Sequence, residues 1–236
     1  MTGQPLWRRA LAELLGTGLL VTVVVGSGIA AQRLSADIGL QLLENSIATA
    51  FGLGVLILLL APVSGAHFNP VVSLADAVLG RSDGTGLQAR DLGVYLAAQT
   101  SGAIGGAVLA NAMFAVPTTI STTERATPAT FLAEIVATAG LVLLIMGLSR
   151  TGRPAPVIAT AVGAYIGAAY WFTSSTSFAN PAVTIGRIFT DTFAGIAPSS
   201  VLPFLAAQLI GAGIAIALTI ALFPRSRQPV DDSSAT

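Results

Sequence analysis

The sequence predicts an all-α membrane protein with six transmembrane helices and two re-entrant half-helices, arranged as an inverted repeat. Two observations carry this prediction. The 236 residues are 53% hydrophobic and only 9% charged, whereas soluble domains carry about 25% charged residues because their surface faces water. The chain also repeats itself, and each half carries the same short polar motif inside an apolar stretch. Most of the surface is therefore expected to face lipid.

Hydropathy predicts six membrane spans, because a helix of about 20 apolar residues crosses the hydrocarbon core. Two shorter apolar stretches lie between spans. They are too short to cross a bilayer and too apolar for ordinary loops, and each begins with Asn-Pro. The spans are expected near residues 7–30, 42–62, 91–114, 131–149, 155–173 and 200–223, and the short stretches over residues 69–80 and 180–190.

Three short segments recur in the same order in the two halves, which indicates an internal duplication. They are Leu-Ala-Glu at 11–13 and 132–134, Asn-Pro at 69–70 and 180–181, and Leu-Ala-Ala-Gln at 96–99 and 205–208. Each half holds three spans, an odd number, so the second half must cross the membrane upside down relative to the first. Inverted repeats of this kind place a site at the bilayer midplane, where paired broken helices meet.

We expect one channel-like domain over residues 1–227, followed by a disordered cytoplasmic tail over residues 228–236. The first repeat covers about 7–114 and the second about 131–223. With the N-terminus inside, eight of the eleven basic residues, all arginines, fall on cytoplasmic segments, which predicts that both termini are cytoplasmic.

Composition also excludes several functions. The formal net charge is zero and there is no cysteine, so the chain offers no electrostatic argument for a nucleic-acid partner and no thiol chemistry. His67 is the only histidine, and a lone histidine without a second ligand does not make a metal site. The sequence holds no nucleophile–base or metal-ligand cluster. We therefore expect neither an enzyme nor a cofactor.

The two Asn-Pro motifs predict helix starts that face one another. Asparagine is a favoured N-cap, and proline at the first helical position has no N–H to leave unpaired. Because the halves are inverted, the half-helices that begin at Asn69 and Asn180 should meet N-terminus to N-terminus. Two positive dipole ends then disfavour a cation, while the asparagine amides can donate to a passing oxygen. The site suits a neutral solute that carries hydroxyl groups.

Glu13 and Glu134 lie within apolar spans, where an ionisable group usually faces the protein interior and has a partner. They occupy matched positions of the repeat. We expect both to accept hydrogen bonds from the irregular backbone that leads into each half-helix, and not to extend toward the membrane surface. Both are thus interpreted as structural residues that support the half-helix loops.

These residues resemble the aquaporin, or major intrinsic protein, family over about residues 6–223. The resemblance rests on Ala-Glu at the start of each half, the glycine-rich run 16–28, the segment 64–71 and the second Asn-Pro-Ala. It implies a pore in each protomer, a homotetramer, and His67 beside the cytoplasmic pore mouth. It also implies the pore motifs Asn69, Pro70, Val71, Asn180, Pro181 and Ala182.

The chain departs from the family pattern where selectivity is set. Family members resemble one another in carrying arginine three residues after the second asparagine, and this chain has Val183. The first motif ends in Val71 where alanine is usual. Transferring the family's constriction by motif spacing gives Phe51, Ala168 (or Gly167), Ser177 and Val183. Such a neck is wide and apolar, so strict selection of single-file water is not expected.

Two charged residues lie at matched places after the asparagines, Asp76 after Asn69 and Arg187 after Asn180. Either they line the pore vestibules, or each attaches the end of its half-helix to nearby backbone or solvent. We favour the second interpretation, because both positions lie near a predicted water-facing boundary.

The predicted function is a passive membrane channel for small uncharged solutes: water, glycerol-like polyols and arsenous acid. The run 180–198 resembles a bacterial aquaporin branch associated with arsenic-resistance genes, which implies a bacterial plasma membrane. One alternative is a general water and glycerol facilitator without a metalloid role. A secondary transporter would need an ion-coupling chain, for which only Glu13 and Glu134 are candidates. A purely structural junction protein would show no permeability.

Overall fold

The computed structural model describes residues 3–81 and 84–224, and this part of the chain contains helices and no strand. The predicted fold class is confirmed. Six helices are long and apolar enough to cross a membrane: α1 (Leu6–Leu34), α2 (Ile38–Ser64), α4 (Ala89–Met113), α5 (Pro128–Arg150), α6 (Ala155–Phe172) and α8 (Pro198–Leu222). The predicted tail, residues 228–236, lies outside the described residues.

Two short helices occupy the predicted half-helix segments, and both begin at the proline of the motif. The first, α3 (Pro70–Gly80), has the predicted length. The second, α7 (Pro181–Gly186), is shorter than predicted and continues as the 3-10 turn η1 (Arg187–Phe189). The chain then leads through the largely buried residues 190–197 into α8.

The span boundaries follow local capping. Helix α2 begins four residues earlier than the predicted residue 42, because the Asp37 carboxylate accepts a hydrogen bond from the Leu40 amide at 2.9 Å and caps the helix. Helix α5 begins at a capping box formed by Thr127 and Thr130. The α2 helix ends at Gly65, whose φ of 91° is a left-handed conformation that glycine adopts without steric cost.

Helix pairing repeats between the two halves. Helix α1 packs along α4, and its counterpart α5 packs along α8. Glycines make the first contact close: a Cβ atom on Gly102 would collide with the backbone of Leu14, and one on Gly106 with the backbone of Gly18. Small residues let helix backbones approach in membranes, where dispersion packing must replace the hydrophobic effect.

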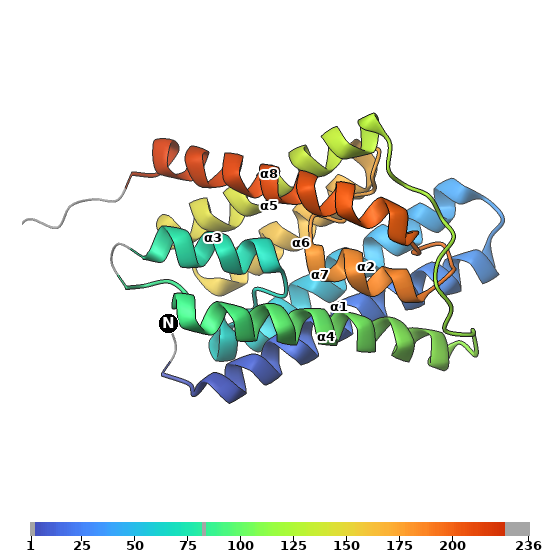
Figure 1. The fold of residues 1–236 in the computed structure, drawn as a ribbon, viewed down its shortest axis with the longest axis horizontal. Coiled ribbons are helices and arrows are strands. Elements are labelled where there is room, and N and C mark those ends of the chain that lie inside the picture. Colours follow the sequence, from blue (N-terminus) through green and yellow to red (C-terminus); the bar gives the residue numbers. More distant parts are fainter. Residues whose placement is uncertain (1–2, 82–83, 225–236) are drawn as a thin grey trace, which may run out of the picture.

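The half-helices enter the bundle from opposite ends and point their N-termini at its centre. Figure 1 shows α3 and α7 approaching one another in this way, and it shows the start of α1 and the end of α8 at the same end of the molecule. The inverted repeat is therefore present in three dimensions.

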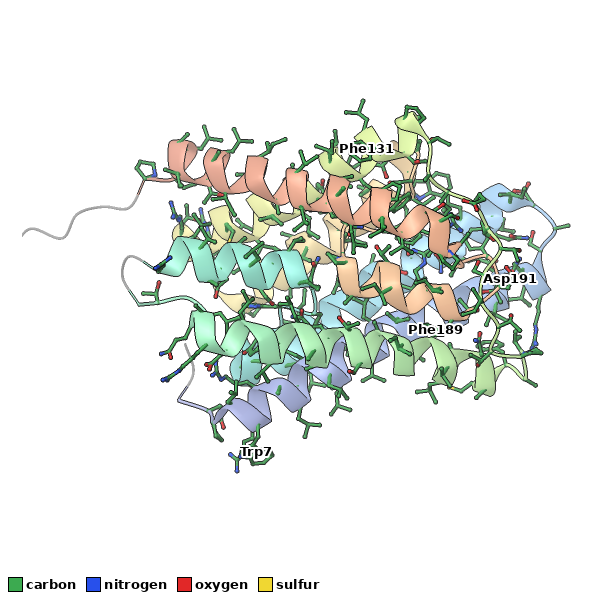
Figure 2. All side chains as sticks on the ribbon, viewed as in Figure 1. Trp7, Phe131, Phe189 and Asp191 are labelled. Atoms are coloured by element: carbon green, nitrogen blue, oxygen red, sulfur yellow. The ribbon has the colours of Figure 1, made fainter. Side chains whose placement is uncertain are left out.

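The outer surface of the bundle is apolar. Large hydrophobic side chains of every spanning helix are exposed, whereas 61% of the apolar window of α1 is buried inside the bundle. Trp7 projects away from the bundle at the start of α1 (Figure 2), with 62% of its surface exposed. Tryptophan is enriched at such positions because its amphipathic ring suits the membrane–water interface.

Candidate functional site

The two asparagines meet at the centre of the bundle and connect the half-helix loops to each other. The Asn69 side-chain amide donates to the carbonyl of Ala179 at 2.8 Å, and the Asn180 amide donates to the carbonyl of Phe68 at 2.8 Å. Each Oδ1 atom caps its own half-helix, accepting from the amide of Val71 in one half and of Ala182 in the other. Each NH₂ group therefore keeps one N–H for another acceptor.

Glu13 holds the first half-helix loop through its backbone. Its Oε1 accepts from the His67 amide at 3.0 Å, and its Oε2 accepts from the Phe68 amide at 2.7 Å. The Ser64 hydroxyl and the Gln99 side chain complete the set of donors. Glu13 is fully buried, so these four hydrogen bonds replace its hydration.

Glu134 holds the second loop in the same way. Its carboxylate accepts from the amides of Phe178 and Ala179, both at 2.9 Å, and from the side chains of Ser175 and Gln208. It too is fully buried. Both glutamates thus hold their loops through two backbone amides and two side-chain donors.

The loops that the glutamates hold are strained at equivalent positions. Ala66 and Phe68 have φ of 51° and 48°, and their counterparts Ser177 and Ala179 have φ of 52° and 45°. A left-handed conformation at a residue other than glycine costs about 1–3 kcal/mol. This strain persists because consecutive loop amides are fixed to one carboxylate, and it explains why buried acids stand at these two places.

A single cavity passes both asparagines. It extends from His67 on one side of the Asn69 and Asn180 pair to Val183 and Arg187 on the other. Its remaining walls are mainly aliphatic side chains of the spanning helices. The predicted pore-motif asparagines thus line one continuous space together with loop residues and mainly aliphatic side chains.

Two predicted neck residues do not line this cavity. Phe51 is 73% exposed on the outside of α2, and Ala168 is exposed on α6. On α2 the cavity is lined by Thr49, Leu53 and Ile57, at helical spacing. Phe51 lies two residues, or about 200°, away from this face, so the placement derived from motif spacing was wrong by half a turn.

The same error applies to α6. Its lining residues are Val162, Ile166 and Tyr170, so Ala168 again lies two residues from the cavity face, and Gly167 is not part of the lining. Tyr170 and Thr49 were missed. Their hydroxyls are 3.1 Å apart and hydrogen-bonded across the two helices. The sequence could have indicated them, because each is a polar residue four positions from an aliphatic residue that lines the cavity on the same helix.

The loop residues of the predicted neck do face the cavity. Ser177 and Val183 are buried and line it. The Ser177 hydroxyl has no hydrogen-bond partner among the described residues. Arg187 lines the cavity as well and is only 4% exposed, so the expectation that it lies near a water-facing boundary was wrong.

His67 and Asp76 lie at the opposite end of the cavity. His67 lines it, with Nδ1 3.0 Å from the Ser73 hydroxyl and Nε2 3.8 Å from the Asp76 carboxylate. Asp76 itself is outside the cavity and accepts a hydrogen bond from the Leu87 amide at 2.6 Å. It therefore attaches the end of α3 to the chain that leads into α4, as the second interpretation of this residue expected.

The connection between α4 and α5, residues 114–127, lies across the end of the bundle near α7 and η1. Asp191, at that end in Figure 2, accepts hydrogen bonds from the Thr122 amide at 2.9 Å and from the hydroxyls of Thr122 and Ser121. These bonds, the backbone bond foremost, lower the pKa of Asp191 below its ordinary value of 3.8. Arg125 donates to the carbonyls of Gly195 and Phe193. The connection is thus fastened to the segment after η1.

No group of three or more potential metal ligands occurs in the part of the chain that the structure describes. What the arrangement supplies chemically is a row of hydrogen-bonding groups beside an aliphatic wall. A solute with hydroxyl groups can replace water along such a row, whereas a cation meets two helix N-termini.

Comparison with known proteins agrees with this geometry. The major intrinsic protein family matches residues 1–179. The chain is 50% identical to the aquaglyceroporin AqpS of Rhizobium meliloti, over 97% of this chain and 96% of that protein. It is 32% identical to the glycerol uptake facilitator protein of Pseudomonas aeruginosa, over 82% of this chain and 77% of the relative.

The fold resembles a solved structure, the aquaglyceroporin from Plasmodium falciparum, with a TM-score of 0.71 and 22% identity over 92% of this chain and 96% of that one. The repeat, the facing half-helices and the matched sequences lead to one conclusion: this chain, an integral membrane protein, belongs to the major intrinsic protein family.

Proposed function

We propose that this chain is a passive membrane channel for small uncharged solutes, including water and glycerol-like polyols. The observation that carries the proposal is the meeting of two half-helix N-termini inside the cavity, with one free N–H on each of Asn69 and Asn180. The names of the two relatives, an aquaglyceroporin and a glycerol uptake facilitator, support the same solute class. The hydrogen bonds of Glu13 and Glu134 argue against an ion-coupled transporter.

We propose further that arsenous acid passes the same pore. It is a neutral trihydroxy molecule of about glycerol size, and it needs donors and acceptors without a bulky obstruction. Val183, in place of the family's arginine, leaves room at the outer neck, and the unpartnered Ser177 hydroxyl offers a hydrogen bond there. In this proposal the neck consists of Thr49, Tyr170, Ser177 and Val183, with Val71 and Ala182 beside the two asparagines.

The test is stopped-flow uptake of water, glycerol and arsenous acid by proteoliposomes of the full chain. Wild-type vesicles should take up glycerol and arsenous acid faster than protein-free vesicles. Val183→Arg should slow both by roughly tenfold or more, the size of effect that a misfit in a narrow site produces. Val183→Thr, nearly equal in volume and uncharged, is the matched control and should stay near wild type.

Each outcome separates two functions. Glycerol uptake without arsenous acid uptake would favour the general facilitator and contradict the metalloid role. Water-only permeation would contradict the proposed neck. Uptake that depends on an imposed proton gradient would contradict the passive channel in favour of a secondary transporter, and no permeation at all would favour the structural junction protein.

Assembly, location and domain organisation are proposed on separate grounds. A homotetramer is supported by the family and by the exposed apolar faces of the spanning helices, and native mass spectrometry tests it. A bacterial plasma membrane with cytoplasmic termini is supported by the arginine distribution and by the common end at which α1 starts and α8 ends (Figure 1). Labelling an introduced cysteine at residue 3 or 224 from outside whole cells tests the orientation. We keep residues 1–227 as one channel domain.

A further inference from the structure

We propose that Arg187 supplies the fixed positive charge of the outer neck, in place of the arginine that is missing at position 183. This inference rests on the proposed channel function and names a residue that sets its ion exclusion. Arg187 lies four residues after Val183, about one helical turn further along the half-helix and η1. Its side chain nevertheless lines the same cavity as Val183 and Ser177.

The Arg187 guanidinium is held in place by two contacts. It lies over the ring of Phe178, with Cζ 3.5 Å from the ring centroid, and its Nε donates to the carbonyl of Ala194. A stacked guanidinium keeps its charge and its planar orientation. Phe178 in turn packs edge-on against Phe204, with ring centroids 5.1 Å apart. The ring is therefore a rigid support for the charge.

The remaining N–H groups of Arg187 are available to the cavity. Only the Nε bond to Ala194 is formed within the described residues, although a guanidinium has five N–H donors. The terminal nitrogens are not among the fully buried unpaired atoms, and the side chain is 4% exposed and lines the cavity. They must therefore face the solute path.

No carboxylate of the described residues forms an ion pair with Arg187, although the buried Glu134 lies within electrostatic range of it. A charge of the same sign is close by, because Arg125 also lies over Phe178, with its Cζ 5.5 Å from the centroid. Tyr170, on the facing helix, lies within electrostatic range of both arginines. A positive charge without an ion-pair partner at a narrow neck repels cations and still offers donors to neutral oxygens.

The inference makes a prediction that differs from a structural role. If Arg187 only supported the loop, a neutral replacement would lower the amount of folded protein and reduce glycerol uptake. If it supplies the excluding charge, the replacement raises the proton leak far more than it changes glycerol uptake, so the ratio of leak to glycerol uptake rises. The two readouts are measured on the same vesicles.

The experiment uses proteoliposomes that contain a pH-sensitive dye. Glycerol uptake is followed by light scattering, and proton leak by dye fluorescence after a pH step in the presence of valinomycin and K⁺. Arg187→Gln should raise the ratio of proton leak to glycerol uptake about tenfold or more above wild type, as expected for removal of a unit charge at short range. Arg187→Met is a second neutral variant, because its unbranched stem can still pack on Phe178.

Two further variants test charge against structure. Arg187→Lys keeps the charge and should restore the wild-type barrier. Val183→Arg combined with Arg187→Gln places the charge at the family's position and should suppress the leak. The matched control is Arg33→Gln: Arg33 also lies over a ring, that of Phe114, and donates to its carbonyl, but it is exposed and outside the cavity.

A neutral variant that conducts glycerol and remains as proton-tight as wild type would overturn the inference. So would a leak that Arg187→Lys fails to suppress. The proposed function fails in a different way, through wild-type vesicles that take up no glycerol. The leak comparison does not depend on which neutral solute passes, so the two failures are distinguishable.

Discussion

Replacing Glu134 with glutamine tests whether one buried carboxylate holds the second half-helix loop. Its Oε1 accepts from the Ser175 hydroxyl at 2.6 Å and the Phe178 amide at 2.9 Å, and its Oε2 accepts from the Ala179 amide at 2.9 Å and the Gln208 side chain at 2.7 Å. An NH₂ group in place of either oxygen cannot accept a hydrogen bond. Ser175 can rotate and Gln208 can turn over, but one backbone amide loses its partner in every arrangement.

The expected magnitude follows from that one amide. A buried donor left unpaired costs about 1–3 kcal/mol, and a neighbour that fails to rearrange adds a similar amount. For a chain of this size 1 kcal/mol lowers the unfolding temperature by about 2–4 °C. Glu134→Gln is therefore expected to lower the apparent unfolding temperature in detergent by roughly 3–10 °C. Glycerol uptake per folded protein should fall as well, because the loop carries Asn180.

Two comparisons make this measurement decisive. Glu13→Gln removes an equivalent acceptor from the first loop and should shift the unfolding temperature by a similar amount. Glu44→Gln removes the same charge from a half-buried residue that accepts no hydrogen bond in the described part of the chain. This variant should leave the unfolding temperature unchanged. If Glu134→Gln unfolds at the wild-type temperature and conducts at the wild-type rate, the carboxylate does not hold the loop.

Three further changes test other parts of the structure. Gly102→Ala places a methyl group against the backbone of α1 and should destabilise by about 1–3 kcal/mol, whereas Gly105→Ala, with open space around it, should be neutral or stabilise slightly in the same thermal assay. Protonation of Asp191 should loosen residues 114–127. The pKa of Asp191 is lowered in the folded state, so its hydrogen bonds stabilise the segment fully above pH 3.8, the ordinary pKa. This stabilisation is lost as the pH falls below that value. Hydrogen-exchange protection of that segment, corrected for the intrinsic pH dependence of amide exchange, should therefore fall on acidification, and Asp191→Asn should abolish this change in protection. Asn180→Asp replaces a donor by a charged acceptor and should reduce glycerol uptake at least tenfold in the vesicle assay, about 1.4 kcal/mol; an unchanged rate would contradict the role of that N–H.

Much of the fold could be predicted because its signals are local. Membrane spans follow from length and hydropathy, half-helix starts from Asn-Pro, and the inverted topology from an odd number of spans in each repeat. The contacts of Glu13 and Glu134 were expected for a similar reason, since a buried acid next to an irregular loop has few other partners. The length of α7 could not be predicted, because its end is decided by the turn that η1 makes against α4.

The neck was harder to predict because it depends on helix rotation. A motif fixes loop residues such as Ser177 and Val183 directly, but it fixes residues on neighbouring helices only through a count along the chain. An error of two residues in that count turns a helix by about 200°. The prediction therefore named Phe51 and Ala168, whereas Thr49 and Tyr170 line the cavity. The helical spacing between polar and aliphatic residues within each span predicts the cavity-lining face better than a residue count from the motif.

The position of Arg187 separates two properties that a single arginine at position 183 would combine. A side chain at position 183 narrows the neck and charges it at once, so size selection and ion exclusion cannot vary independently. We propose that here Val183 limits the width, while the guanidinium lies over Phe178, with Cζ 3.5 Å from the ring centroid. In the proposed arrangement the pore can admit a larger neutral solute and still repel cations. The missing arginine therefore predicts a wider pore without predicting an ion leak.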